Sequence, residues 1–255
     1  MDNVKNMERY RFNMGKKFTE KHLIPYYDCD VLGQLKVPRL IEMMIKASGS
    51  QCDSLGLTNE FIASFGLSWI ITEHDLIINR LPLAEEEVSV TSEAESYNKF
   101  FSYRKYWIHS ASGEELAVME STFALMNIKE RTVNAAPLEI MAPFESEKIK
   151  KIRHGEKIPE RTQDATKQAF HVSFWDIDNN YHVNNTVYSA WMIDSHSFDF
   201  LIKYRPKRLL IKYNKEIRYD EQVMVFVDTN QDNTFYHVDH GSELCAEGKI
   251  EWVER

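Results

Sequence analysis

The sequence predicts an α+β fold in which two antiparallel sheets each wrap around a long central helix. Three observations lead to this prediction. A polar motif occurs twice, as DCDVLGQL at residues 28–35 and as DIDNNYHV at residues 176–183. A largely apolar stretch typical of a helix follows each copy, and segments that alternate apolar and polar residues follow each stretch. Because these elements recur in the same order, they indicate an internal duplication.

The first half begins with a predicted strand at residues 17–26, which leads into the polar motif. The stretch PRLIEMMIKASGSQC at residues 38–52 then predicts a helix, because it is long and largely apolar. Turn signals such as SASGEE separate the strands expected after it, at residues 67–80, 85–96, 100–110 and 115–128. A single helix followed by a run of strands is typical of an α+β unit.

The second half repeats this order with shorter loops. A strand at residues 167–173 precedes the motif, and NTVYSAWMIDSHSFDFLI at residues 185–202 predicts the second helix. Strands are expected after it at residues 209–219, 222–229, 234–240 and 244–253. We therefore predict one domain at residues 1–140, a charged linker at 141–166 and a second domain at 167–255.

The composition indicates a cytoplasmic protein without membrane insertion. Hydrophobic residues make up 43% of the 255 positions, but no apolar run approaches the roughly 20 residues needed to cross a bilayer. The first 18 residues lack the apolar segment of a signal peptide. The three cysteines, Cys29, Cys52 and Cys245, are widely spaced and form no CxxC pair, which favours buried thiols in a reducing compartment.

The charge distribution argues against general nucleic-acid binding. The formal net charge is -8, whereas such binding needs a dominant basic field. Two stretches are nevertheless basic, KIKKIRHGEK at residues 148–157 and KYRPKRLLIKYNK at residues 203–215. They are interpreted either as a solvated linker and a solvated strand edge, or as a docking surface for an acidic partner.

The second polar motif predicts a reactive site at the start of a helix. Asn184 or Asn185 is a natural N-cap, and the first backbone N–H groups of a helix have no partner within it. Such a helix start attracts negative charge, so backbone N–H groups near residues 183–185 are candidate donors to an oxyanion. Asp178, Asn180 and His182 would stand beside these donors at the mouth of an apolar cavity. This combination suits acyl transfer from an apolar substrate.

The pattern D-x-N-x-H-V-N-N-x-x-Y at residues 178–188 resembles the acyl-[acyl carrier protein] thioesterases of plants and bacteria, which are built from two tandem hotdog folds. The resemblance extends over nearly the whole chain and implies a tandem double hotdog. It also implies release of a free fatty acid from the 4'-phosphopantetheine of acyl carrier protein, with the acyl chain held mainly by the first half. Because the plastid-targeting extension of plant members is not seen, a bacterial enzyme is expected.

The resemblance also assigns roles to residues. It carries the catalytic aspartate, asparagine and histidine to Asp178, Asn180 and His182, and it implies that Glu216, on the strand after the second helix, completes the site. Some members have a cysteine beside this glutamate, but here the position is Ile217, so a thiol mechanism is not expected. The candidate substrate-binding residues are Met43, Met44, Trp69, Asn184 and Asn185.

Thioester hydrolysis needs a base or nucleophile, stabilisation of an oxyanion and exclusion of water from the acyl chain. Asp178 and Glu216 are the candidate base and nucleophile, and attack by water and an anhydride intermediate both remain open. His182 would orient or donate, and Asn180 would position the water or the second carboxylate. No metal or cofactor is expected, because the motif lacks a second ligand cluster.

Three alternatives remain open. An acyl-CoA thioesterase would use the same chemistry, and a homodimer is compatible with either enzyme. A non-catalytic acyl-binding hotdog protein would keep the cavity but lose the carboxylates.

In the first motif, Leu32 and Gln34 stand where the second has asparagine and histidine, so that copy is interpreted as degenerate, with Asp30 as the candidate for a second site. A serine hydrolase is not expected, because GLSWI at residues 66–70 lacks the last glycine of G-x-S-x-G.

Overall fold

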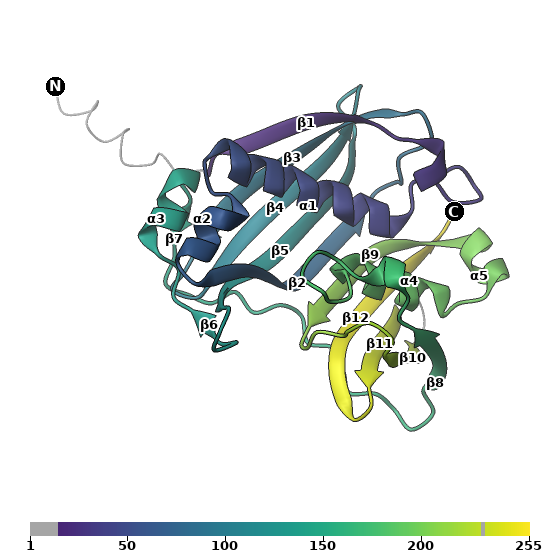
Figure 1. Cartoon of the computed structure of the whole chain (residues 1–255). Helices are drawn as coiled ribbons and strands as arrows, with labels where there is room; N and C mark the ends of the chain where they lie inside the picture. The colour runs from purple at the N-terminus through teal and green to yellow at the C-terminus, as the bar shows by residue number, and fades with distance from the viewer. Residues whose placement is uncertain (1–14, 231–232) are drawn as a thin grey trace, which may run out of the picture.

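The computed structural model describes residues 15–230 and 233–255, which form one large, mainly antiparallel sheet with the main helices against one face (Figure 1). The α+β prediction is confirmed. The absence of a signal peptide is predicted from the first 18 residues, of which residues 1–14 lie outside the described residues. None of the described helices is long and apolar enough to cross a membrane.

The N-terminal half wraps its strands around the longest described helix. Within this helix, Leu40, Ile41, Met44 and Ala47 are fully buried, and their spacing of three and four residues places them on the face turned to the sheet. The elements of this half are β1 (Lys17–Leu23), η2 (Tyr26–Asp28), α1 (Val37–Ser54), α2 (Asn59–Ser64), β2 (Leu67–Ile78), β3 (Glu87–Tyr97), β4 (Phe101–Ser110) and β5 (Glu115–Asn127).

A connecting segment with short elements leads to the C-terminal half. It contains β6 (Val133–Asn134), α3 (Leu138–Met141), η3 (Ala142–Phe144) and β7 (Glu147–Lys148). The C-terminal half consists of β8 (Thr166–His171), η4 (Phe174–Asp176), α4 (Asn185–Asp194), α5 (Phe198–Lys203), β9 (Tyr204–Tyr213), β10 (Gln222–Asn230), β11 (Asn233–His240) and β12 (Glu243–Glu254).

The two predicted sheets are joined edge to edge. Strand β2 of the first half pairs with β9 of the second, from Glu73 opposite Lys212 to Ile77 opposite Arg208. The result is a 12-stranded sheet, in which ten strands follow the order β1-β3-β4-β5-β2-β9-β12-β11-β10-β8, while β6 pairs with β5 and β7 with β3. The predicted tandem arrangement is present, and the pairing of β2 with β9 adds a feature that the sequence did not predict: it hides an edge of each sheet that would otherwise be open.

The second central helix is shorter than predicted. The stretch at residues 185–202 divides into α4 and α5 instead of forming one helix. The Ser195 hydroxyl donates to the carbonyl of Trp191 at 2.7 Å, and the Ser197 hydroxyl caps α5 by accepting from the amide of Phe200 at 3.3 Å. Serine side chains that bond to the backbone in this way favour helix ends over helix interiors.

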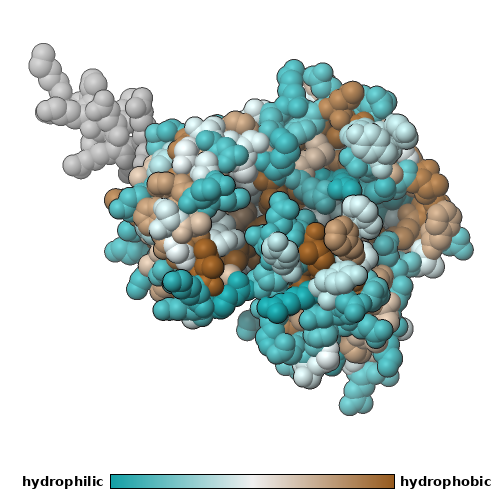
Figure 2. All heavy atoms as spheres, in the orientation of Figure 1, coloured by the Kyte–Doolittle hydropathy of each residue, from teal (hydrophilic) through white to brown (hydrophobic). Residues whose placement is uncertain are grey.

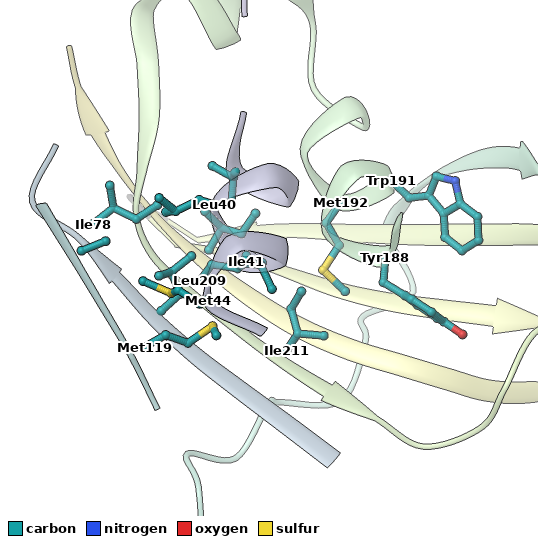
Figure 3. Packing of buried hydrophobic residues seen from close by; sticks show 14 of the residues in the cluster. Leu40, Ile41, Met44, Ile78, Met119, Tyr188, Trp191, Met192, Leu209 and Ile211 are labelled. Carbon is teal, nitrogen blue, oxygen red and sulfur yellow. The ribbon is translucent and has the colours of Figure 1, made fainter. Parts of the chain in front are cut away.

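Two apolar clusters fill the space between helices and sheet. The larger one is shared by both halves, since Leu40 and Met44 of α1 lie in it together with Met192 of α4 and Ile211 of β9 (Figure 3). The smaller one lies in the N-terminal half and includes Leu57, Ile62, Leu67, Tyr97, Leu125, Ile140 and Phe144. Because the larger cluster spans the joint between the halves, its burial also holds them together.

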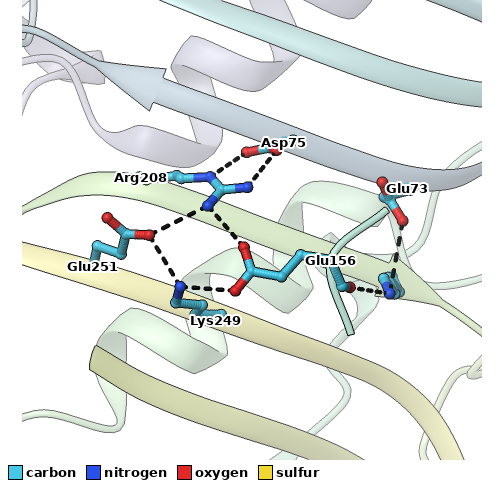
Figure 4. A network of polar contacts seen from close by, with 7 residues as sticks. Glu73, Asp75, Glu156, Arg208, Lys249 and Glu251 are labelled. Carbon is cyan, nitrogen blue, oxygen red and sulfur yellow. Dashed lines mark hydrogen bonds and ion pairs between the residues drawn. The ribbon is translucent and has the colours of Figure 1, made fainter. Parts of the chain in front are cut away.

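An ion-pair network crosses the same joint (Figure 4). The Arg208 guanidinium of β9 binds both carboxylate oxygens of Asp75 on β2, at 2.8 and 2.7 Å. It also donates to Glu156 of the connecting segment at 2.8 Å and to Glu251 of β12 at 3.3 Å. Lys249 binds Glu156 at 2.8 Å and Glu251 at 3.0 Å, so two cations are shared among three carboxylates from three parts of the chain.

The structure corrects both interpretations of the basic stretch at residues 203–215. The stretch spans β9, which pairs with β2 on one side and β12 on the other, so it is not a solvated edge. Most of its cations are neutralised within the protein and offer little to an acidic partner: Lys203 pairs with Glu254, Arg208 with Asp75, Lys212 with Glu73 and Lys215 with Glu243.

Candidate active site

A tight turn just before α4 fixes the position of Asp178. Its backbone N–H donates to the carbonyl of His182 at 2.9 Å, and its own carbonyl accepts from the amide of Tyr181 at 3.0 Å. Tyr181 closes the turn in the left-handed region, with φ of 64°. The Asp178 carboxylate accepts from the backbone N–H of Asn180 at 2.8 Å and from its side-chain amide at 3.4 Å. The carboxylate is thus oriented by its own turn.

His182 and Glu216 form a close pair. The Nε2 atom of His182 lies 2.9 Å from Oε2 of Glu216, and the two side chains are 20% and 35% exposed. Glu216 lies in the loop that follows β9 instead of on a strand, which corrects the position given by the resemblance. The loop is anchored beside the turn, because the amide of Val183 donates to the carbonyl of Ile217 at 2.8 Å. Two residues far apart in sequence, His182 and Glu216, are therefore brought to one place.

The structure adds a residue that the sequence did not suggest. Arg131, in the turn between β5 and β6, reaches across from the N-terminal half and pairs through Nη2 with the same Oε2 of Glu216. Glu216 is thus held by a histidine from its own half and by a cation from the other half. No motif surrounds Arg131, so only the three-dimensional arrangement identifies it.

Asn184 is the N-cap of α4. Its side-chain oxygen accepts from the amide of Thr186 at 2.9 Å, which decides between the two asparagines that the sequence offered. The capping bond occupies this oxygen, so it is less suited to the substrate-binding role predicted for Asn184. Half-buried Tyr213 donates to the carbonyl of Asn185 at 3.0 Å, and desolvation raises the pKa of Tyr213, so this hydroxyl stays protonated.

The predicted oxyanion donors need correction. The amide of Val183 is bonded to Ile217, and the amide of Asn184 donates to the carbonyl of Asp176 at 2.8 Å. In residues 15–230 and 233–255, no acceptor is found for the amide of Asn185, the first residue of α4. This is the backbone group at the helix start that can receive a developing negative charge.

The first polar motif folds in the same way as the second but is differently occupied. The amide of Asp30 donates to the carbonyl of Gln34 at 2.7 Å, as Asp178 does to His182, and Gly33 has φ of 74° where Tyr181 has 64°. The side chains of Asp30 and Gln34 both contact Arg255. With a cation on its carboxylate and no histidine, this turn lacks the groups that the second turn brings together.

The predicted acyl-binding residues fall into two groups. Met44 is fully buried in the larger apolar cluster, and Met43 packs against that cluster while half-buried. Trp69 packs against the smaller cluster instead and makes an edge contact with Phe123 at 6.2 Å between ring centroids. The three residues therefore do not line one common apolar cluster.

Cysteine thiols or metal ligands would be the alternative catalytic groups to Asp178 and Glu216. Cys29, Cys52 and Cys245 are free thiols, and burial raises the pKa of each. Across the described part of the chain, no group of three or more His, Cys, Asp or Glu side chains is arranged to hold a metal ion.

Figure 2 shows a largely polar face of the protein, on which apolar residues appear in separate small patches.

Comparison with known proteins gives consistent matches over nearly the whole chain. The family model described as the acyl-ACP thioesterase N-terminal domain matches residues 15–144, and the model of the C-terminal domain matches residues 159–254. A putative oleoyl thioesterase of Lactobacillus plantarum is 31% identical, with a TM-score of 0.89, and the match covers 94% of this chain and 97% of that one.

Two more distant matches agree. The solved structure of the 12:0-ACP thioesterase of Umbellularia californica superimposes with a TM-score of 0.81 at 18% identity, over 94% of this chain and 98% of that one, which supports the tandem hotdog fold. A chloroplastic acyl-[acyl-carrier-protein] hydrolase of Cuphea viscosissima is 26% identical over 93% of this chain. The chain spans 63% of the length of that plant protein.

Proposed function

Because the chain belongs to the acyl-ACP thioesterase family, we propose that it hydrolyses fatty acyl thioesters of acyl carrier protein to free fatty acid and holo-carrier protein. The observation that carries this proposal is the pairing of His182 with Glu216 beside the turn that holds Asp178 and Asn180. A non-catalytic acyl-binding protein would have no need for two carboxylates oriented in this way.

The site offers a separate group for each step of thioester hydrolysis. One carboxylate either takes a proton from a water molecule that attacks the thioester carbonyl, or attacks that carbonyl itself to form an anhydride that water then hydrolyses. In both routes the carbonyl oxygen becomes an oxyanion, for which the amide of Asn185 is the candidate donor. Collapse of the tetrahedral intermediate expels the thiolate of the carrier arm, which then gains a proton.

The remaining parts of the proposal concern setting and partner. We assign catalysis to residues 167–255 and the acyl chain to the first half, with Met43 and Met44 in its lining. Docking of the acidic carrier protein falls to residues 148–157, where Lys150, Lys151 and Lys157 are exposed. A cytoplasmic location agrees with the free thiols, a bacterial origin agrees with the similarity to the Lactobacillus protein, and a homodimer remains part of the proposal.

A hydrolysis assay on matched substrates tests the proposal. Acyl chains of increasing length are presented as thioesters of carrier protein and, in parallel, of CoA, and thiol release is followed. We expect a higher kcat/KM on carrier-protein thioesters at every length that reacts. Equal or better turnover of the CoA thioesters would favour the acyl-CoA thioesterase, and no release from either series would exclude thioester hydrolysis.

A further inference from the structure

A row of polar side chains crosses the interior of the N-terminal half, between the two apolar clusters. It interrupts the apolar side chains of the two clusters on either side of it, and a charged side chain such as that of Arg104 is seldom fully buried. None of its members is more than 6% exposed: Gln51 of α1, Ser92 of β3, Arg104 of β4, Ser121 of β5 and His74 of β2.

The register of the sheet places these residues side by side. Arg104 lies opposite Ser121 across β4 and β5, and Ser121 lies opposite His74 across β5 and β2. Residues directly opposite one another in antiparallel strands point to the same face, so the three side chains form a continuous line. Gln51 lies two turns beyond Met44 on α1, on the helix face that covers this line.

The guanidinium in the row has no carboxylate partner. Arg104 donates through Nη1 to the side-chain oxygen of Gln51 at 2.5 Å and to the hydroxyl of Ser92 at 2.8 Å. Its guanidinium carbon lies 5.0 Å from the centre of the Phe144 ring. Within residues 15–230 and 233–255, no acidic side chain forms an ion pair with it. A buried cation held only by neutral groups is costly unless a further acceptor completes the site.

Two more polar atoms beside the row are buried without a partner. In the described residues, Nε2 of His74 has no hydrogen bond, although its Nδ1 lies 2.7 Å from the hydroxyl of Ser121. The Tyr106 hydroxyl lies beside Ser48 but forms no hydrogen bond of normal geometry in the described residues, and the Ser48 hydroxyl donates to the carbonyl of Ile45 at 2.7 Å. Burial lowers the pKa of His74 to about 3 and raises the pKa of Tyr106 to about 12, so both are neutral near pH 7. The row therefore contains hydrogen-bond donors without an acceptor, whereas buried donors in proteins normally have one.

We propose that this row is a binding site for an oxygen atom carried by the acyl chain, as a hydroxyl, oxo or terminal carboxylate group. The inference rests on the proposed function, which places the acyl chain in this half. The spare donors of Tyr106 and Arg104 would bind that oxygen, and the apolar cluster on the near side would hold the methylene groups before it. A plain chain of the same length would leave these donors unsatisfied.

The position of the row fits this role. Glu42 of α1 accepts a hydrogen bond from Thr186 at the start of α4, at 3.0 Å, so this end of α1 lies close to the candidate active site. Gln51 stands nine residues further along the helix, or about 13 Å at 1.5 Å per residue. The oxygen would thus lie well away from the thioester. Met44 and Met119 are buried before the row, and their flexible side chains can shift to admit a chain.

Binding of free acids to the whole chain tests the inference without requiring hydrolysis. Calorimetry compares dodecanoic acid with its positional hydroxy and oxo derivatives and with dodecanedioic acid. We expect one oxygenated acid to bind at least about fivefold more tightly than dodecanoic acid, as one additional buried hydrogen bond provides. A preference for hydroxy or oxo acids identifies a neutral chain oxygen as the ligand, and a preference for the diacid identifies a carboxylate.

Three variants assign the preference to the row. Tyr106→Phe removes a single oxygen, and Arg104→Met removes the charge; we expect at least one of them to abolish the preference. Tyr103→Phe is the matched control on the same strand, since its hydroxyl accepts from Asn98 at 3.0 Å and from the amide of Arg153 at 2.9 Å, outside the row. This control should keep the preference. If Arg104→Met does not fold, Tyr106→Phe still carries the test.

Equal or weaker binding of every oxygenated acid by the unmodified protein would overturn the inference. A preference that survives both Tyr106→Phe and Arg104→Met would overturn it as well. These outcomes are separate from the proposed function. If the unmodified protein hydrolyses acyl thioesters normally but shows no preference for oxygenated acids, only this site is contradicted. If it shows the preference but hydrolyses no thioester, only the enzymatic activity is contradicted.

Discussion

Replacing Arg208 with methionine should weaken the joint between the two halves. The substitution keeps an apolar stem but removes four charge-assisted contacts, at 2.7 to 3.3 Å, with Asp75, Glu156 and Glu251. Loss of one partner from a fully buried pair costs about 3 to 5 kcal/mol, and an exposed pair contributes at most about 1 kcal/mol. Because Arg208 is 25% and Asp75 30% exposed, we expect an intermediate loss of about 2 kcal/mol in the free energy of unfolding.

Thermal and urea denaturation measure this loss. For a chain of this size, about 2 kcal/mol corresponds to a fall in Tm of roughly 4 to 8 °C. Lys207→Met is the matched control, because Lys207 is the exposed neighbour on the same strand and should change stability by less than about 0.5 kcal/mol. If Arg208→Met were no less stable than Lys207→Met, the network would not hold the halves together and the reasoning would fail.

Three further predictions concern the site, the pH dependence and the acyl chain. Arg131→Ala should lower kcat more than it raises KM, Arg131→Lys should restore part of the loss, and neither should matter in a Glu216→Gln background; additive losses would exclude action through Glu216. Hydrogen bonds from Lys249 hold the pKa of Glu156 below 4.5, so its stabilisation is present above about pH 4.5 and is lost as the pH falls further; acid denaturation of Glu156→Gln should lack this part. Met44→Trp should shift hydrolysis toward shorter acyl chains, and an unchanged length profile in a folded variant would place the chain elsewhere.

Local features of the site could be predicted from the sequence because they are encoded by neighbouring residues. The turn at Asp178 depends on a hydrogen bond to Asn180 two positions away, and the cap at Asn184 depends on the helix that follows it. The matching turn at Asp30 was likewise visible as a repeat. The pairing of His182 with Glu216 came from the family resemblance, since their separation in sequence carries no geometric signal.

The features that were missed depend on contacts between distant segments. Strand β9 looked like a basic surface stretch because its sequence does not reveal that Asp75 and Glu251 neutralise Arg208. Pairing of β2 with β9 could not be foreseen, since nothing in the sequence of either strand specifies its partner in the sheet. Arg131 is an isolated arginine in a turn, and its role appears only when the two halves are brought together.

The most direct test of the central claim compares the two matching aspartates. Asp178→Asn removes the carboxylate charge but can still accept the backbone bond that closes the turn, so the fold should persist. We predict that it lowers kcat/KM on an acyl-carrier-protein thioester by about 10²- to 10⁴-fold. Asp30→Asn, with melting temperatures measured for both, should stay within about threefold of the unmodified protein. A folded but inactive Asp30→Asn together with an active Asp178→Asn would contradict the account and place the site in the first half.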